Sequence, residues 1–151
     1  MSDWNKRHGL VGKTAVVTGA TKGIGIETCR VVADAGADIA GVGRDADGWK
    51  EVKAAVESKG RRCVAITADM ATVAGTEKAA KEALSAFGHV DILVNNAGIA
   101  LIDPLIDAKV EDWDMTMAVN LRAPWLMAKH LAPGMIKRKA GKIINISSQA
   151  G

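Results

Sequence analysis

Three glycines in one short stretch could bind a phosphate group. Gly19, Gly23 and Gly25 lie between the apolar residues 14–17 and a helical pattern of apolar residues that begins at Ile24. A glycine turn at a helix N-terminus presents unpaired N–H groups and the positive end of the helix dipole to an anion. Gly19 can adopt positive φ, and Gly23 and Gly25 lack the Cβ that would keep a pyrophosphate or the neighbouring strand away. The candidate binding residues of the turn are Gly19, Thr21, Lys22, Gly23, Ile24 and Gly25.

The carbonyl oxygen of Asn120 is a second group that could take part in chemistry. In an α-helix this oxygen would accept the N–H of residue 124, but residue 124 is Pro and has no N–H. The carbonyl is therefore free to bind another group, such as a water molecule. The alternative is that Pro124 only kinks the helix.

The elements that must position these residues are short apolar strands that alternate with longer helices. We expect strands at about 13–18, 39–42, 63–67, 91–94 and 142–146. We expect helices at about 23–35, from Trp49 to Gly60, at 73–87 and at 110–137. This alternation implies βαβ crossovers and a parallel sheet with helices on both faces. The predicted fold class is α/β, a Rossmann-type doubly wound sheet of about five strands, with residues 1–151 as one domain.

Polar and glycine residues collect where the predicted strands end. In a sheet of this kind, ligands bind beyond the carboxyl ends of the strands, where the strand order reverses. The sequence therefore predicts one site at that edge of the sheet. Its parts are 18–25, Gly43–Arg44, Asp69–Met70, 95–98 and Ser147–Ser148.

Charge and composition exclude several classes of protein. Apolar residues make up 48% and charged residues 25% of the chain, which is typical of globular proteins. The basic cluster at Lys137, Arg138, Lys139 and Lys142 lacks the interleaved aromatic residues of a nucleic-acid surface, so we interpret it as a solvated helix end. No apolar run approaches membrane-spanning length, and the first residues lack the apolar stretch of a signal peptide.

Cysteine and histidine residues show no metal-binding spacing. Cys29 and Cys63 lie in apolar patterns, and we expect buried free thiols in a reducing, cytoplasmic setting. We expect His8, His89 and His130 to be structural, and we expect no metal site.

Four motifs resemble the short-chain dehydrogenase/reductase family. They are T-G-x-x-x-G-I-G at 18–25, N-N-A-G at 95–98, Asn120 within a helix, and I-N-I-S-S-x-A-G at 144–151. They occur in the family's order and cover about residues 10–151. The resemblance implies an oxidoreductase that uses a nicotinamide dinucleotide to interconvert a ketone and a secondary alcohol. Its small-molecule substrate could be a 3-oxoacyl thioester, or a sugar acid or polyol.

The resemblance also implies which residues contact the cofactor beyond the glycine turn. Asp69 could instead be a helix N-cap or a turn residue. The implied contacts are Asp69 and Met70 at the adenine, and Asn96, Ala97 and Gly98 beside the adenosine ribose.

Cofactor choice depends on the end of the second strand. An acid there bonds the ribose 2′-OH of NAD, whereas a nearby Arg accommodates the 2′-phosphate of NADP. Here the acidic position is Gly43, followed by Arg44, and Lys22 can approach the same phosphate. We therefore expect NADP(H). The alternative is NAD(H), with Asp45 binding the ribose and Arg44 on the surface.

The implied catalytic residues are incomplete in this chain. Ser148 matches the catalytic serine, with Ser147 as its structural neighbour, and Asn120 matches the asparagine whose carbonyl holds a water in the family's proton relay. From the pattern alone, Ser148 could also be a plain turn serine. The chain has no Tyr and stops before the family's Tyr-x-x-x-Lys motif. We expect a C-terminally truncated fragment that is inactive alone; the alternative is a non-catalytic dinucleotide-binding module.

One helical stripe could be core or a subunit interface. Trp113, Met117, Leu121 and Trp125 repeat every four residues. In the family, helices of this region commonly build a dimer face. The resemblance therefore implies that the full-length protein is a homo-oligomer, either a dimer or a tetramer.

Overall fold

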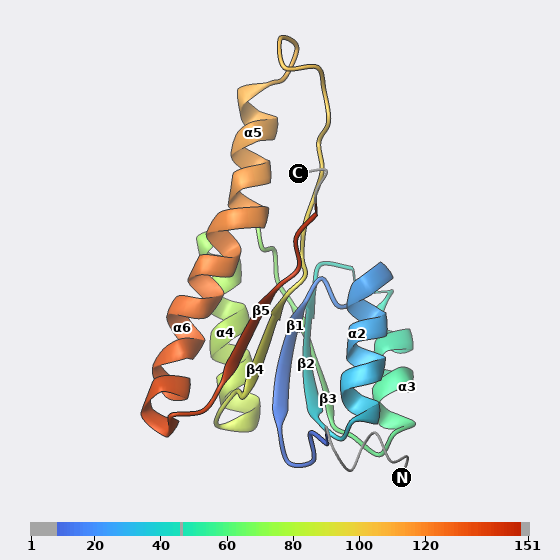
Figure 1. The fold of residues 1–151 in the computed structure, drawn as a ribbon. Helices are drawn as coiled ribbons and strands as arrows, with labels where there is room; N and C mark the ends of the chain where they lie inside the picture. The colour runs from blue at the N-terminus through green and yellow to red at the C-terminus, as the bar shows by residue number, and fades with distance from the viewer. Residues whose placement is uncertain (1–8, 46, 149–151) are drawn as a thin grey trace.

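Five parallel strands form a single sheet in the order β3-β2-β1-β4-β5 (Figure 1). The structure is a computed structural model that describes residues 9–45 and 47–148. The strands are β1 (Thr14–Thr18), β2 (Asp38–Gly43), β3 (Cys63–Thr67), β4 (Ile92–Asn95) and β5 (Lys142–Asn145). Each lies within one residue of its predicted bounds, so the predicted α/β doubly wound class is confirmed.

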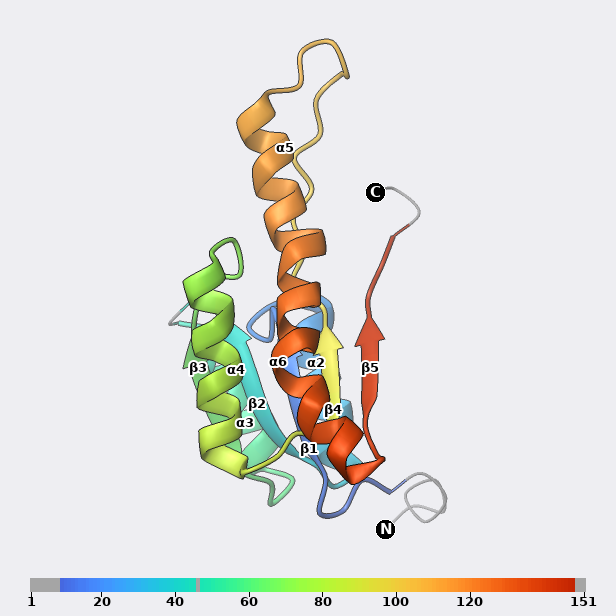
Figure 2. The same cartoon turned by 90° about the vertical axis from the view of Figure 1, so that its left-hand side faces the viewer.

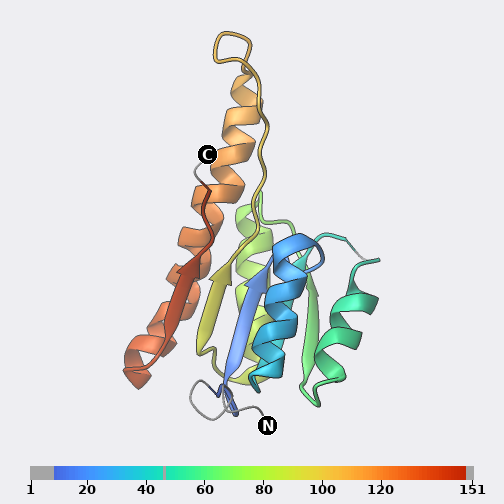
Figure 3. The ribbon, with the colours of Figure 1, turned by 45° about the vertical axis from the view of Figure 1, so that its right-hand side comes forward.

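Helices cover both faces of the sheet (Figures 1 and 3). The helices are α2 (Gly23–Asp34), α3 (Trp49–Glu57), α4 (Val73–Phe87), α5 (Val110–Met117) and α6 (Ala123–Arg138). α2 and α3 pack on one face, and α4 and α6 pack on the other, as Figure 2 shows from the side of α4 and α6. Each face has its own apolar core.

β1 is buried along its whole length between β2 and β4. Successive side chains of a strand point to opposite faces. Val16 accordingly packs in the core beside α4 and α6, whereas Ala15 and Val17 pack in the core beside α2 and α3. The chain continues from β1 outward to β2 and β3, and then returns to β4 on the other side. The strand order therefore reverses between β1 and β4, which places the ligand crevice above their carboxyl ends.

The predicted single helix at 110–137 is divided by a π-helical turn, η1 (Ala118–Arg122), between α5 and α6. The N–H of Ala123 bonds to the carbonyl of Ala118, five residues earlier. Pro124 at the start of α6 has no N–H to donate, which accounts for the break in the regular α-helical bonding at this point. α5 and the loop before it project beyond the carboxyl edge of the sheet (Figure 1), and α5 contains no buried residue.

The helical stripe is not core in this structure. Trp113, Leu121 and Trp125 are 62%, 65% and 59% exposed. With Met117 they line an open groove of about 730 Å³ along α5, η1 and the start of α6. Of the two alternatives for this stripe, the core is therefore excluded and the subunit interface remains.

The basic cluster at the end of α6 is exposed, as predicted. The exposed residues are Lys137, Arg138, Lys139 and Lys142. Arg138 also has partners, because its Nη2 donates to the carbonyl of Val90 at 2.7 Å and lies 3.7 Å from Asp91 Oδ1. The solvated end of α6 is therefore also tied to the start of β4.

Both cysteines are free, as predicted, but only Cys29 is fully buried. Burial, and to a lesser degree the nearby Cys63 thiol, raise the pKa of Cys29 to about 12. Burial also raises the pKa of the half-buried Cys63 to about 11. Among residues 9–45 and 47–148, no group of three or more acidic, His or Cys side chains is arranged to hold a metal ion. In the same part of the chain, no helix has the length and apolar character needed to span a bilayer.

Candidate cofactor-binding site

A crevice of about 400 Å³ opens at the carboxyl ends of the strands. Its walls come from the loops after β1, β2, β3 and β4, together with Val119 of η1. Every predicted cofactor residue lines it except Gly25. Those that do are Gly19, Thr21, Lys22, Gly23, Ile24, Arg44, Asp69, Met70, Asn96, Ala97 and Gly98. The fold thus brings together residues that the sequence places in four separate segments.

The backbone of the glycine turn admits no side chain at two points. Gly19 has a φ of 65°, and a Cβ there would lie 2.9 Å from the Cα of Ala97. A Cβ on Gly25 would lie 1.9 Å from the carbonyl oxygen of Gly19. Gly25 therefore does not line the crevice, but it allows α2 to start directly against the turn. Gly23 also has positive φ, with open space around it.

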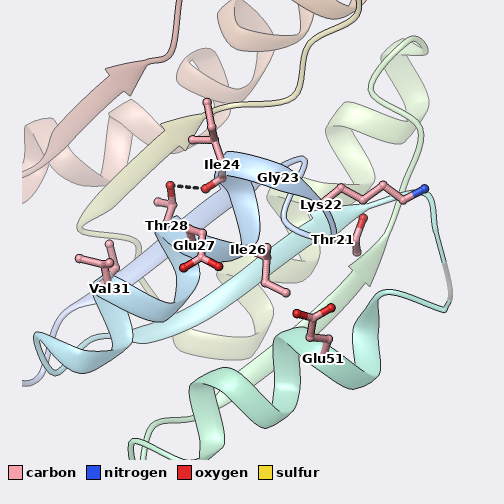
Figure 4. Close-up of a pocket in the computed structure, with 10 residues that line it drawn as sticks. Thr21, Lys22, Gly23, Ile24, Ile26, Glu27, Thr28, Val31 and Glu51 are labelled. Carbon is pink, nitrogen blue, oxygen red and sulfur yellow. Dashed lines mark hydrogen bonds between the residues drawn. The ribbon is translucent and has the colours of Figure 1, made fainter.

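The N-terminus of α2 is open to an anion. Its N-cap residue, Lys22, has extended backbone and forms no side-chain cap, and the first turn of the helix contains no acidic residue. The N–H groups of this turn therefore lack a side-chain acceptor and can bind a phosphate. Figure 4 shows Lys22 extending away from α2, and Thr28 donating a hydrogen bond to the carbonyl of Ile24 at 2.7 Å.

Thr18 organises this crevice, although it is not among the predicted site residues. Its Oγ1 accepts hydrogen bonds from the backbone N–H groups of Asn96 and Ala97, both at 3.0 Å. The side-chain amide of Asn96 donates in return to the carbonyls of Thr18 at 3.0 Å and Gly19 at 3.3 Å. The side chain of Asn96 is thus turned toward the glycine turn. A buried hydroxyl at the end of the strand, directly before the turn, is the signal that could have indicated Thr18.

An ion pair spans one end of the crevice. Lys22 Nζ lies 2.8 Å from Asp45 Oδ2, and the N–H of Asp47 donates to Asp45 Oδ1 at 3.1 Å. The hydrogen bond from Lys22, then the one from Asp47, hold the pKa of Asp45 below its usual value. Asp45 therefore stays ionised near neutral pH. Arg44 beside it is exposed and carries the second positive charge of the crevice.

Asp69 and Met70 follow β3 and have different environments. Asp69 Oδ1 accepts the N–H of Ala71 at 3.0 Å, so Asp69 forms a turn, while Thr72 is the N-cap of α4. Of the alternatives considered for Asp69, the turn role is present and the N-cap role is not. Met70 is almost fully buried and packs into the core beside α4 and α6.

Asn120 lies in η1 and uses its side chain in a way that the sequence did not indicate. Its Oδ1 accepts the N–H of Ile99 at 2.9 Å, and its Nδ2 donates to the carbonyl of Ile99 at 2.8 Å. This pair of bonds fixes the loop after β4 against η1. The backbone carbonyl of Asn120 meets Pro124, which cannot donate to it.

Known proteins share this sequence pattern and this fold. The family described as short chain dehydrogenase matches residues 13–151. The chain belongs to the short-chain dehydrogenase family. It is 41% identical over 143 residues to L-xylulose reductase of Mesocricetus auratus, an alignment that covers 94% of this chain and 55% of the reductase.

Solved short-chain dehydrogenases have the same fold. The L-sorbose reductase of Gluconobacter frateurii, determined with NADPH and L-sorbose, superposes with a TM-score of 0.90 at 35% identity, over 94% of this chain and 54% of that one. A metagenomic short-chain oxidoreductase in complex with NADP superposes with a TM-score of 0.88 at 38% identity, over 92% and 63%. The chain thus spans about half the length of the curated relatives it matches.

In this short-chain dehydrogenase, Ser147 and Ser148 follow β5 at the same edge of the sheet as the crevice, and both are exposed. β5 is held to β4 by Ile146, whose N–H donates to the carbonyl of Asn95, and by the side chains of Asn95 and Asn145, which bond at 2.9 Å. The end of the serine motif, residues 149–151, lies outside the described residues.

Proposed function

We propose that the crevice binds NADP(H) and that the full-length protein is an oxidoreductase that interconverts a ketone and a secondary alcohol. The observation that carries this proposal is a glycine turn at an uncapped helix N-terminus, combined with two cations in one crevice. Membership of the short-chain dehydrogenase family supports it, as do relatives determined with NADP and NADPH. We also propose that residues 1–151 form one cofactor-binding domain and the N-terminal part of that protein.

Residues of the crevice have distinct roles in this proposal. N–H groups at the start of α2 bind the pyrophosphate. Arg44 and Lys22 bind the 2′-phosphate, Asp69 and Met70 border the base, and 96–98 border the adenosine ribose. A nicotinamide, when bound, supplies or accepts the hydride. The alternative is NAD(H), with Asp45 on the ribose. Lys22 and Asp45 are paired with each other at 2.8 Å in this structure, so either assignment requires that ion pair to open.

Two residues are proposed to act on the substrate side. Ser148 donates a hydrogen bond to the substrate oxygen, and the carbonyl of Asn120 holds a water molecule that relays a proton. Neither group can itself supply a proton near neutral pH, because a serine hydroxyl has too high a pKa and an amide does not titrate. The chain contains no Tyr. We therefore propose that the 151 residues alone show no turnover.

We also propose an oligomeric state, a location and a substrate class. The exposed groove at Trp113, Leu121 and Trp125 supports a homo-oligomer, because large apolar patches mark interaction surfaces. The free thiols of Cys29 and Cys63 support a reducing, cytoplasmic setting. The names of the xylulose and sorbose reductases support a polyol or keto-sugar as the substrate rather than a 3-oxoacyl thioester.

Replacement of Ser148 tests the catalytic part of this proposal. In the full-length protein, Ser148→Ala should lower kcat for NADPH-dependent ketone reduction about a hundredfold, because one donor to the developing oxyanion is lost. Ser147→Ala is the matched control and should change kcat less than about threefold, since only Ser148 is assigned to the substrate. An unchanged kcat in Ser148→Ala would overturn the assignment, and so would steady turnover by the 151-residue chain.

The alternative function is a non-catalytic dinucleotide-binding module. The sequence of the gene beyond Gly151 separates the two functions. A Tyr-x-x-x-Lys motif soon after that residue supports the enzyme, and a natural stop codon supports the module.

A further inference from the structure

Arg122 connects η1 to a distant wall of the crevice. It is the last residue of η1, and its Nη2 donates a hydrogen bond to the carbonyl of Ala71 at 2.5 Å, across 51 residues of sequence. Ala71 lies in the loop between β3 and α4. We propose that Arg122 is a positioning residue for the base of the bound dinucleotide, an inference that rests on the proposed function.

The β3–α4 loop lies where the base of a dinucleotide would be. The pyrophosphate occupies the N-terminus of α2, directly after β1, and the adenosine ribose lies at the end of β2. The sheet order places β3 next to β2, on the side away from β1. The base that follows the ribose therefore lies over the end of β3, where Asp69 and Met70 line the crevice.

Local hydrogen bonds give this loop its shape, and Met70 anchors its start in the core beside α4 and α6. Asp69 Oδ1 accepts the N–H of Ala71 at 3.0 Å, and the carbonyl of Asp69 accepts both the N–H and the hydroxyl of Thr72 at 3.2 Å. All of these partners lie within three residues. Among the described residues, Arg122 is the side chain outside 67–78 that donates a hydrogen bond to this loop.

The π-helical turn that carries Arg122 is itself anchored to the sheet. Val119 in the same π-helical turn is buried and forms part of the crevice wall. Asn120, two residues before Arg122, binds the backbone of Ile99 with both atoms of its amide. η1 is thus anchored to the loop after β4 by Asn120 and to the loop after β3 by Arg122. Loss of the hydrogen bond from Arg122 would loosen only the loop after β3.

Nucleotide fragments test this assignment in the full-length protein by isothermal titration. In Arg122→Met, we expect NADPH and 2′,5′-ADP to bind about tenfold more weakly, because a charge-assisted hydrogen bond is lost and the loop must be ordered on binding. NMNH, which lacks the adenosine half, should bind within about twofold of the wild-type affinity, because it has no base to contact the β3–α4 loop. The KM for NADPH should rise, with kcat unchanged. Arg122→Lys should restore part of the affinity, because it keeps a charged donor.

Arg138→Met is the matched control, since Arg138 also donates to a backbone carbonyl, that of Val90, but at the opposite end of the sheet. It should leave all three affinities unchanged. Equal losses for NADPH and NMNH in Arg122→Met, or no loss for either, would overturn the inference. If Arg122→Met does not fold, Arg122→Lys must show the same selective loss at smaller size. If the wild type binds neither NADPH nor 2′,5′-ADP, the proposed function fails and the inference fails with it.

Discussion

The glycines of this turn are required because they lack a side chain. Gly19 and Gly25 approach each other so closely that a Cβ on Gly25 would overlap the Gly19 carbonyl. Gly23 has no such neighbour and is required only for its positive φ of 52°. Gly23 and Gly25 are therefore required for different physical reasons, and substituting each of them distinguishes these reasons.

We predict that Gly25→Ala destabilises the chain far more than Gly23→Ala. The first places a Cβ 1.9 Å from a backbone oxygen, so the turn must move, and we expect a loss of about 3 kcal/mol or more. The second forces an alanine into left-handed backbone, which costs about 1–2 kcal/mol. Urea unfolding of both variants measures the difference. Equal losses would show that the close approach of Gly25 is not a constraint.

Single-residue roles could be predicted where they depend on local backbone, and not where they depend on a distant partner. The positive φ of Gly19 follows from the turn alone. The bonds of Thr18 to the backbone of Asn96 and Ala97 join positions 78 and 79 residues apart. Asp45 likewise depends on a partner in another loop, Lys22. Only the folded sheet brings such pairs together.

At the scale of elements, the apolar pattern predicted the position of each strand but not the π-helical turn that interrupts the long helix. The missing N–H of Pro124 predicts a free carbonyl at Asn120, but the apolar spacing continues through η1 without a change of period. A π-helical turn adds one residue to one turn of helix, a change too small to alter that spacing visibly. Its consequence is large, because η1 holds the loops after β3 and β4.

We predict that the buried thiol of Cys29, on the side of α2 that faces the sheet, makes the protein less stable at alkaline pH. Burial raises the pKa of Cys29 to about 12, compared with 9.0 for a free thiol. The folded state thus keeps a proton that the unfolded state loses, so the stability is fully present below pH about 9 and is lost between about 9 and about 12. The slope for one such group is at most about 1.4 kcal/mol per pH unit.

Urea unfolding at pH about 8 and about 10 measures this effect. We expect Cys29→Ala to be less stable than the wild type at the lower pH, because Cys29 is fully buried, but to lose less stability as the pH rises. An equally steep loss in both proteins would show that Cys29 is not responsible.

At the scale of the whole molecule, the sheet is covered unevenly. β5 is an edge strand, and Ile143, Ile144 and Ile146 are each more than 40% exposed. The apolar pattern alone decided neither the strand order nor the choice between core and interface for Trp113 and Trp125, because both depend on which elements lie side by side. The strand ends could be predicted, because all parallel strands of one sheet place their carboxyl ends at one edge.

We propose that this edge of the sheet binds NADP(H) and that Arg44 makes the site prefer NADP(H) over NAD(H). Isothermal titration of the full-length protein with NADPH and with NADH tests the claim most directly. We predict that the wild type binds NADPH more tightly, and that Arg44→Ala weakens NADPH binding about tenfold while NADH binding stays the same, because only NADPH carries the 2′-phosphate. Tighter binding of NADH by the wild type, or unchanged NADPH binding in Arg44→Ala, would contradict it.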